Sequence, residues 1–184
     1  MMLARADDSV LVIIDVQERL AAAMSPGVRA GVVRNARILL EAATRLGVPT
    51  LVTEQYPKGL GPTVAQVAEM LPGGTPRFEK TCFSCVGAAS FSAALDESGR
   101  TQVILAGMEA HVCILQSALE LRAVRQEVFV IEDACCSRNR EHHANAMDRL
   151  RTAGVLVCNT ESVVFEWLRD ARHEHFNAIS ALLR

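Results

Sequence analysis

Short apolar runs recur along the chain, and stretches whose apolar residues have helical spacing separate them. We expect five of these runs to be strands: residues 10–14, 48–53, 102–106, 127–131 and 155–158. Within the runs apolarity is continuous rather than alternating, which is typical of parallel strands that are covered on both faces. The pattern therefore favours a parallel sheet in the interior of the protein.

The intervening stretches carry apolar residues three and four positions apart, as amphipathic helices do. The expected helices cover residues 28–46, 63–70, 87–97, 117–125, 141–153, 160–168 and 171–184. Strands that alternate with helices predict an α/β fold, with three layers in which helices cover both faces of a mostly parallel, Rossmann-like sheet. No linker or repeat interrupts the pattern, so we expect a single domain over residues 1–184.

Polar residues stand directly after several of the expected strands. They are Asp15, Glu54, residues 107–113 and Asp133. In open sheets of this kind, ligands bind outside the carboxyl ends of the strands. These residues can therefore line one cleft although they are far apart in the sequence.

Cys113 lies where an expected buried strand gives way to an expected helix. A free thiol has a pKa near 8.5, and a helix N-terminus or a neighbouring cation favours the thiolate. The unpaired N–H groups of the helix and the ammonium of Lys80 are both candidates for this effect, and the same N–H groups can hold an oxyanion. The position alone equally allows a buried cysteine that packs under the helix.

Asp15 and Lys80 are the candidate partners of Cys113. A partly desolvated carboxylate at Asp15 can take the thiol proton as a general base, although an aspartate at a strand end also commonly caps nearby N–H groups. Phe78 and Phe83 flank Lys80 and suggest that it is held partly out of water. The alternative for Lys80 is a solvated position in a loop.

The other cysteines give weak signals. Cys82 and Cys85 form one CxxC pair, which cannot build a four-ligand zinc site and lies outside the strand–CxxC–helix context of a redox motif. We expect Cys135, Cys136 and Cys158 to be small buried hydrophobic side chains.

The histidines do not form a metal-binding pattern either. The pairs 142–143 and 173–175 diverge on a helix. The sequence has no G-x-S-x-G elbow, no GxGxxG loop and no P-loop. We therefore expect no metal and no cofactor.

The composition and charge of the chain argue against some classes of binding partner. The chain of 184 residues has 22% charged residues, a formal net charge of −2 and no basic block, so nothing favours nucleic acid or an anionic membrane. Its apolar runs are far shorter than the roughly 18 residues of a membrane span. The first residues lack an apolar signal core, which favours a cytoplasmic, reducing location with free thiols.

Three stretches together resemble the isochorismatase-like cysteine hydrolase family, in its branch of isochorismatase domain-containing proteins. They are residues 12–17 (VIIDVQ), 78–81 (FEKT) and 106–113 (AGMEAHVC), and the loop 53–61 (TEQYPKGLG) adds to them. The resemblance implies a six-stranded parallel sheet. One strand then escapes the pattern, and we expect it near Val163 or between Ala134 and Arg138.

The resemblance also implies roles. Cys113 would be the nucleophile, Asp15 the general base that later activates water, and Lys80 the cation that holds both in place. A cis peptide bond between Met108 and Glu109 would direct the backbone N–H groups of Glu109 and Cys113 toward an oxyanion. We expect substrate to be bound by four further side chains: Gln17, Tyr56, Phe83 and His111.

One departure from the family pattern bears on the activity. Nicotinamidases of this family carry an Asp-x-His metal motif after the second strand, and here that place reads Glu54-Gln55-Tyr56. Retention of Cys113 favours hydrolysis of an amide-type C–N bond in a small molecule over hydrolysis of a vinyl ether.

The alternatives are vinyl-ether hydrolysis and a non-catalytic, regulatory protein. We expect a homo-oligomer, a dimer or a tetramer. The tail at residues 171–184 carries an apolar face, made of Phe176, Ile179, Leu182 and Leu183, which suits packing either within the chain or across an interface.

Overall fold

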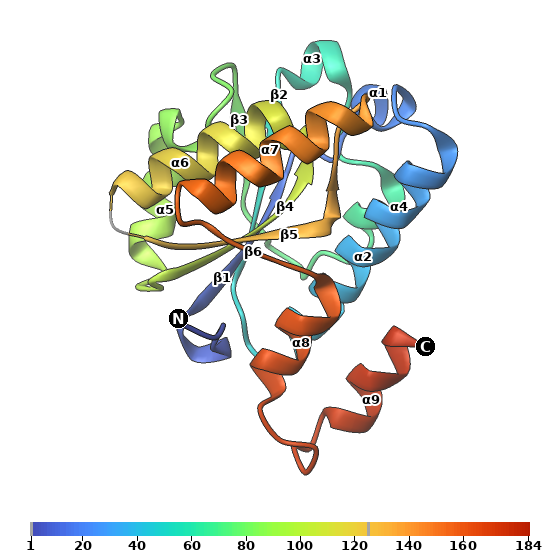
Figure 1. The fold of residues 1–184 in the computed structure, drawn as a ribbon, viewed down its shortest axis with the longest axis vertical. Coiled ribbons are helices and arrows are strands. Elements are labelled where there is room, and N and C mark those ends of the chain that lie inside the picture. The colour runs from blue at the N-terminus through green and yellow to red at the C-terminus, as the bar shows by residue number, and fades with distance from the viewer. Residues whose placement is uncertain (1, 125) are drawn as a thin grey trace.

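A six-stranded, wholly parallel sheet forms the centre of the protein (Figure 1). The computed structural model describes residues 2–124 and 126–184. The strands are β1 (Ser9–Ile14), β2 (Thr50–Gln55), β3 (Arg77–Lys80), β4 (Gln102–Met108), β5 (Glu127–Cys136) and β6 (Leu156–Cys158). Their order across the sheet is β3-β2-β1-β4-β5-β6, which is the Rossmann order. The predicted fold class is confirmed.

The five predicted strands are present, but the expected places for the sixth are wrong. It is β3, which pairs with β2 at the edge of the sheet. Its four residues alternate between exposed Arg77 and Glu79 and buried Phe78 and Lys80, so half of this short strand is charged and solvent-exposed. A strand of this length with so few apolar residues gives no recognisable strand pattern in the sequence. Val163 lies instead in a helix.

The helices surround the sheet. They are α1 (Glu18–Ala22), α2 (Pro26–Arg45), α3 (Pro57–Leu60), α4 (Ala65–Ala68), α5 (Ala89–Glu97), α6 (Leu115–Ala123), α7 (Arg140–Thr152), α8 (Thr160–Leu168) and α9 (Phe176–Ser180). Single turns are η1 (Ala6–Asp8), η2 (Cys85–Gly87), η3 (Ala110–Ile114) and η4 (Ala181–Leu183). The predicted helix 117–125 starts earlier, and its last residue lies outside the described residues. Of the predicted helix 171–184, only α9 and η4 are helical.

Alternate side chains of each strand enter two separate cores. Leu11 and Ile13 of β1 pack with α2 and α8, whereas Val10, Val12 and Ile14 pack with α5, α6 and α7. All five side chains are completely buried. The continuous apolarity of the strand thus reflects a sheet that is covered on both faces (Figure 1).

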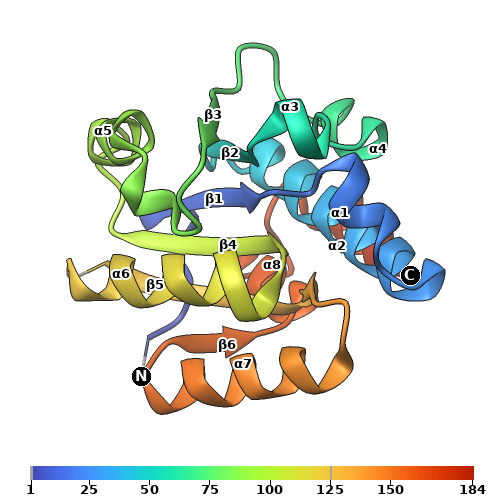
Figure 2. The same cartoon turned by 90° about the horizontal axis from the view of Figure 1, so that it is seen from above.

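The C-terminal tail packs on its own chain. Ile179 is completely buried, and Phe176, Leu182 and Leu183 pack against the same core as α2. Figure 2 shows the chain ending beside α2. The apolar face of the tail is therefore largely packed against the rest of the chain. Among the described residues, no helix has the length and apolarity that a membrane crossing requires.

Candidate active site

The strand order reverses between β1 and β4, and this is where an open α/β sheet forms its ligand crevice. Asp15 follows β1, and the turn that carries Cys113 follows β4. The two strands approach closely here, because a Cβ atom at Gly107 would lie 1.9 Å from the carbonyl oxygen of Ile14. Gly107 also has a φ of +138°, which favours glycine.

Asp15 is completely buried, and both of its carboxylate oxygens are bonded. Oδ1 accepts a hydrogen bond of 2.7 Å from Oγ1 of Thr53, and Oδ2 accepts one of 2.6 Å from Nζ of Lys80. The residue has a φ of 52°, and aspartate tolerates this left-handed region better than most residues. The bonds to Thr53 and Lys80 fix the carboxylate that β1 presents to the crevice.

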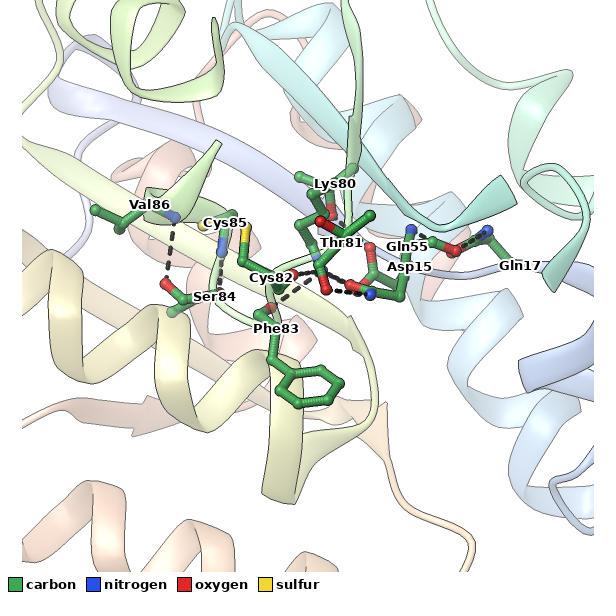
Figure 3. A network of polar contacts seen from close by, with 12 residues as sticks. Asp15, Gln17, Gln55, Lys80, Thr81, Cys82, Phe83, Ser84, Cys85 and Val86 are labelled. Carbon is green, nitrogen blue, oxygen red and sulfur yellow. Dashed lines mark hydrogen bonds and ion pairs between the residues drawn. The ribbon is translucent and has the colours of Figure 1, made fainter. Parts of the chain in front are cut away.

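Lys80, the last residue of β3, carries a fully buried ammonium (Figure 3). Besides Asp15, its Nζ donates to Oε1 of Gln55 at 2.8 Å and to the carbonyl oxygens of Phe83 at 3.0 Å and Cys82 at 3.3 Å. The sulfur of Cys113 is not among the hydrogen-bond partners of Nζ within the described residues. The solvated alternative for Lys80 is therefore excluded, and the ammonium is oriented by Asp15 and by the loop after β3.

Cys113 lies within a helical turn rather than at its start. The π-helical turn η3 begins at Ala110, and the N–H of Ile114 donates to the carbonyl oxygen of Glu109 at 3.3 Å, five residues back. The helical conformation thus begins three residues before Cys113, so the thiol does not lie at the strand-to-helix junction where the sequence placed it. Such single π turns occur frequently at functional sites.

The Cys113 thiol is 5% exposed and lies within hydrogen-bonding reach of the Asp15 carboxylate. Burial, and then the negative charge of Asp15, raise its pKa from 9.0 to about 12, although Lys80 acts in the opposite direction. Burial and Asp15 thus oppose the predicted thiolate, whereas Lys80 favours it, as predicted. Activation of Cys113 stays a prediction, and the Asp15 carboxylate beside it is the candidate acceptor of the thiol proton.

The peptide bond between Met108 and Glu109 is cis, as expected. The backbone of Glu109 lies close enough to Cys113 to lower the pKa of the thiol. The buried carboxylate of Glu109 instead accepts hydrogen bonds from the backbone N–H of Arg138 at 2.9 Å and from Nε of Arg138 at 3.1 Å. The residue thus links the turn of Cys113 to the end of β5. An oxyanion role for the N–H groups of Glu109 and Cys113 stays a prediction.

Gln17 is completely buried, and each of its side-chain polar atoms is bonded to the backbone. Oε1 accepts from the N–H of Gln55 at 2.7 Å, and Nε2 donates to the carbonyl oxygens of Gln55 at 3.0 Å and Gly61 at 2.7 Å. The amide that we expected to contact substrate is therefore engaged with the loop after β2.

Tyr56 and Phe83 are exposed aromatic residues beside Lys80, with 55% and 52% of their surface accessible. The N–H of Tyr56 donates to the carbonyl oxygen of Lys80 at 2.8 Å, and the carbonyl of Phe83 accepts from Nζ. The backbones of both residues are thus fixed to the ion pair while the residues themselves are exposed. This placement is compatible with the predicted contacts to substrate.

His111 precedes Cys113 in η3 and faces the elements after β5. Its Nδ1 lies 2.9 Å from Oγ of Ser137, and its ring centroid lies 4.7 Å from that of His142. Burial lowers the pKa of His111, although the charge of Glu109 acts in the opposite direction. His111 therefore lies two residues before Cys113 and bonds to the segment after β5.

Thr53 and Gln55 are polar residues of the site that the sequence-based interpretation missed. They are two positions apart on β2, so their side chains lie on the same face of the sheet. One reaches Asp15 and the other reaches Lys80. Between them, Glu54 points to the other side and accepts from the N–H and Oγ1 of Thr63. The period of two at the end of a buried strand was the available signal.

In the described part of the chain, no three His, Cys, Asp or Glu side chains gather closely enough to hold a metal ion. All six cysteines are free. Cys85, Cys135 and Cys136 are buried, as expected for the last two, whereas Cys82 and Cys158 are half-buried. Burial raises the pKa of Cys85 to about 12.

A well-formed cavity among the described residues lies elsewhere. It measures about 860 Å³, lies along α2, α4 and the end of the tail, and includes none of Asp15, Lys80 and Cys113. The hydrogen bonds around Lys80 mark the site better than cavity size does, because an open crevice at a sheet edge encloses little volume.

Comparison with known proteins gives consistent matches over nearly the whole chain. The family model described as "Isochorismatase domain" matches residues 9–162. Isochorismatase domain-containing protein 2 of Danio rerio is 39% identical over 176 residues, covering 95% of this chain and 86% of the relative. Isochorismatase domain-containing protein 2A of Mus musculus is 36% identical over 181 residues, covering 97% and 84%.

Two solved structures are similar in fold and sequence. The MAR1 ribonuclease of Caenorhabditis elegans superposes with a TM-score of 0.92 at 33% identity, covering 99% of this chain and 92% of that one. YcaC of Pseudomonas aeruginosa, solved with hexane-2,5-diol and covalent acrylamide, has a TM-score of 0.90 at 27% identity, covering 98% and 91%.

Proposed function

The chain belongs to the isochorismatase family of hydrolases, and we propose that it cleaves an amide-type C–N bond of a small molecule through a thioester on Cys113. The observation that carries the proposal is the position of Asp15. Its buried carboxylate has Lys80 bonded to one oxygen and the Cys113 thiol within hydrogen-bonding reach.

Proton transfer begins the reaction. Burial and the charge of Asp15 raise the pKa of Cys113 to about 12, which disfavours a free thiolate at neutral pH. Asp15 therefore takes the thiol proton as the sulfur attacks the carbonyl carbon, and the charge moves from the carboxylate to the carbonyl oxygen. The backbone N–H groups of Glu109 and Cys113 are the proposed donors to that oxyanion.

The intermediate then collapses. The C–N bond breaks, the amine or ammonia leaves with the proton that Asp15 received, and a thioester to Cys113 remains. Asp15, again a carboxylate, removes a proton from water, which attacks the thioester and releases the carboxylic acid and the thiol. Lys80 keeps Asp15 aligned throughout by the bond from its Nζ to Oδ2.

One relative supports thiol chemistry. YcaC of Pseudomonas aeruginosa, at 27% identity, was solved with covalent acrylamide. Acrylamide is an electrophile that thiolates attack. An activated nucleophile in a related fold is compatible with the role proposed for Cys113.

A second candidate activity is ribonuclease activity, because a relative at 33% identity is named a ribonuclease. The formal net charge of −2 and the lack of a basic block in the sequence favour a small uncharged or weakly charged substrate instead. Vinyl-ether hydrolysis is the third candidate. A cytoplasmic location and a homo-oligomer stay predictions.

The test compares the wild-type chain with Cys113→Ala and with Cys82→Ala, the matched control at a half-buried cysteine outside the proposed mechanism. Each is assayed with a panel of small amides, with isochorismate and with single-stranded RNA. We expect amide turnover that falls at least about a thousandfold in Cys113→Ala only. Amide turnover that survives in Cys113→Ala would exclude the covalent mechanism, and turnover of RNA or isochorismate alone would exclude the amide proposal.

A further inference from the structure

Gln55, the last residue of β2, is bonded on both sides of its side-chain amide. Oε1 accepts from Nζ of Lys80 at 2.8 Å, and Nε2 donates to the carbonyl oxygen of Thr81 at 2.8 Å. Only one orientation of the amide satisfies both partners, because the flipped amide would present N–H groups to an ammonium and oxygen to a carbonyl. Gln55 therefore supplies an oriented acceptor to Lys80 (Figure 3).

Gln17 holds the backbone of Gln55 in the same way. Its amide bonds both the N–H and the carbonyl oxygen of Gln55 and, through Nε2, the carbonyl oxygen of Gly61. Gln17 lies two residues beyond Asp15 in the segment after β1, so the two amides connect this segment to β2 and β2 to β3. We refer to the side chains of Gln17 and Gln55 as the amide clamp.

The ammonium of Lys80 needs such an acceptor. It has three protons and no access to water, and a buried charge is tolerated only when it is paired and hydrogen-bonded. Asp15 accepts a hydrogen bond from one of the three N–H groups. The carbonyl oxygens of Phe83 and Cys82 lie 3.0 and 3.3 Å from Nζ. Gln55 offers an acceptor without charge, so that Lys80 has one carboxylate partner rather than two.

We propose that Gln17 and Gln55 are positioning residues of the hydrolase, which hold Lys80 so that its charge is directed to Asp15. Neither residue touches the reacting atoms. The inference extends the proposed function by assigning the support of the base, and it gives Gln17 a role other than substrate contact. It predicts that the amide clamp controls two properties. One is the protection of Lys80 from acetylation, and the other is the pH range in which Cys113 reacts.

The charged and titratable groups around the clamp are few. Asp15 and Lys80 form the ion pair, and the thiols of Cys85 and Cys113 are close enough to feel both charges. On the neighbouring strands, Glu54 is bonded to Thr63 and Glu79 is exposed; the Glu109 carboxylate of the Cys113 turn is paired with Arg138.

The first experiment measures Lys80 alone. The chain has only two lysines, Lys58 and Lys80, and Lys58 is exposed, so it serves as an internal reference. Trace acetylation is followed by mass spectrometry in the wild type, Gln55→Met, Gln17→Met and Gln66→Met, the last a control at an exposed glutamine. We expect the Lys80-to-Lys58 ratio to rise about tenfold in the two clamp variants only, since a hydrogen bond to a charged group is lost or displaced.

The second experiment separates positioning from simple stability. Gln55→Glu keeps the shape and the acceptor but adds a carboxylate that competes for Lys80. Asp15 and the new carboxylate at position 55 then share one proton up to a higher pH. In the pH profile of Cys113 alkylation by iodoacetamide, the acidic limb should therefore move upward by about one pH unit. The melting temperature is recorded for each variant, and Gln66→Glu should leave the limb in place.

The outcomes distinguish the clamp from the proposed function. Unchanged Lys80 protection in Gln55→Met and Gln17→Met would overturn the clamp whatever Cys113 does. A lower melting temperature in Gln55→Glu with the acidic limb at the wild-type pH would also overturn it, because the residue would then act on stability only. Amide turnover that survives in Cys113→Ala would contradict the proposed function, while the acetylation of Lys80 would still decide the clamp.

Discussion

Nζ of Lys80 lies 2.6 Å from Oδ2 of Asp15, and neither side chain is accessible to solvent. Two charges in such a place stabilise each other only as a pair, since removal of one partner leaves an uncompensated buried charge. The relationship joins the strands β1 and β3, which are not neighbours in the sheet. It is therefore both a structural bond and the proposed basis of activation.

Lys80→Met removes the ammonium and leaves the Asp15 carboxylate buried without its cation. We expect the free energy of unfolding to fall by about 3–5 kcal/mol, as for other broken buried pairs. The rate of Cys113 alkylation near neutral pH should fall with it. Urea denaturation and peptide mapping after iodoacetamide treatment measure the two effects. Lys58→Met is the matched control, and equal stability of the two variants would contradict the importance of the pair.

Gly107→Ala tests the close approach of β4 to β1. The added Cβ would lie 1.9 Å from the carbonyl oxygen of Ile14, at a φ of +138° that side chains rarely adopt. The strands must separate beside Asp15, so we expect a loss of about 4 kcal/mol or failure to fold. Gly73→Ala is the control, because nothing lies within 4 Å of its Cβ position. Similar thermal unfolding of both variants would show that the approach is not restrictive.

The buried thiols predict a loss of stability in alkaline solution. Burial raises the pKa of Cys113 and of Cys136 from 9.0 to about 12 in the folded chain. The unfolded chain therefore releases these protons first, and it is favoured as the pH rises from about 9 toward 12. Each such thiol lowers the unfolding free energy by at most about 1.4 kcal/mol per pH unit in that window.

Cys136→Ala isolates one of these contributions. Its stability should decline less steeply than that of the wild type between pH 9 and about 11 and in parallel with it between pH 6 and 8. Denaturant unfolding at several pH values makes the comparison. Parallel curves over the whole range would contradict the raised pKa of Cys136.

Phe83→Ala tests the exposed ring beside the ion pair. Its backbone carbonyl, not its ring, accepts from Lys80, so the ion pair should persist in the variant. We expect a KM for the identified amide that is about tenfold higher, with a kcat within about threefold of the wild-type value, because the ring contributes only to uniform binding of substrate. A large fall in kcat with an unchanged KM would instead assign the ring to the transition state.

Much of the fold is determined locally. The continuous apolar runs of β1 and β4 require burial on both faces, and this requirement alone predicts a parallel sheet between helices. The strand β3 escaped prediction because two of its four residues are charged and exposed at the sheet edge. Its pairing with β2 depends on the position of β2, which no pattern within β3 records.

The candidate site divides in the same way. The sequence by itself, through its resemblance to a family, determined that Asp15, Lys80 and Cys113 belong together and that a cis bond precedes the turn of Cys113. Only the tertiary structure shows that burial and Asp15 raise the pKa of Cys113 and that the Gln17 amide is bonded to the backbone of Gln55. The physical reason is that a pKa and a hydrogen-bond partner depend on which atoms surround a side chain. Those atoms come from strands that meet only in the folded chain.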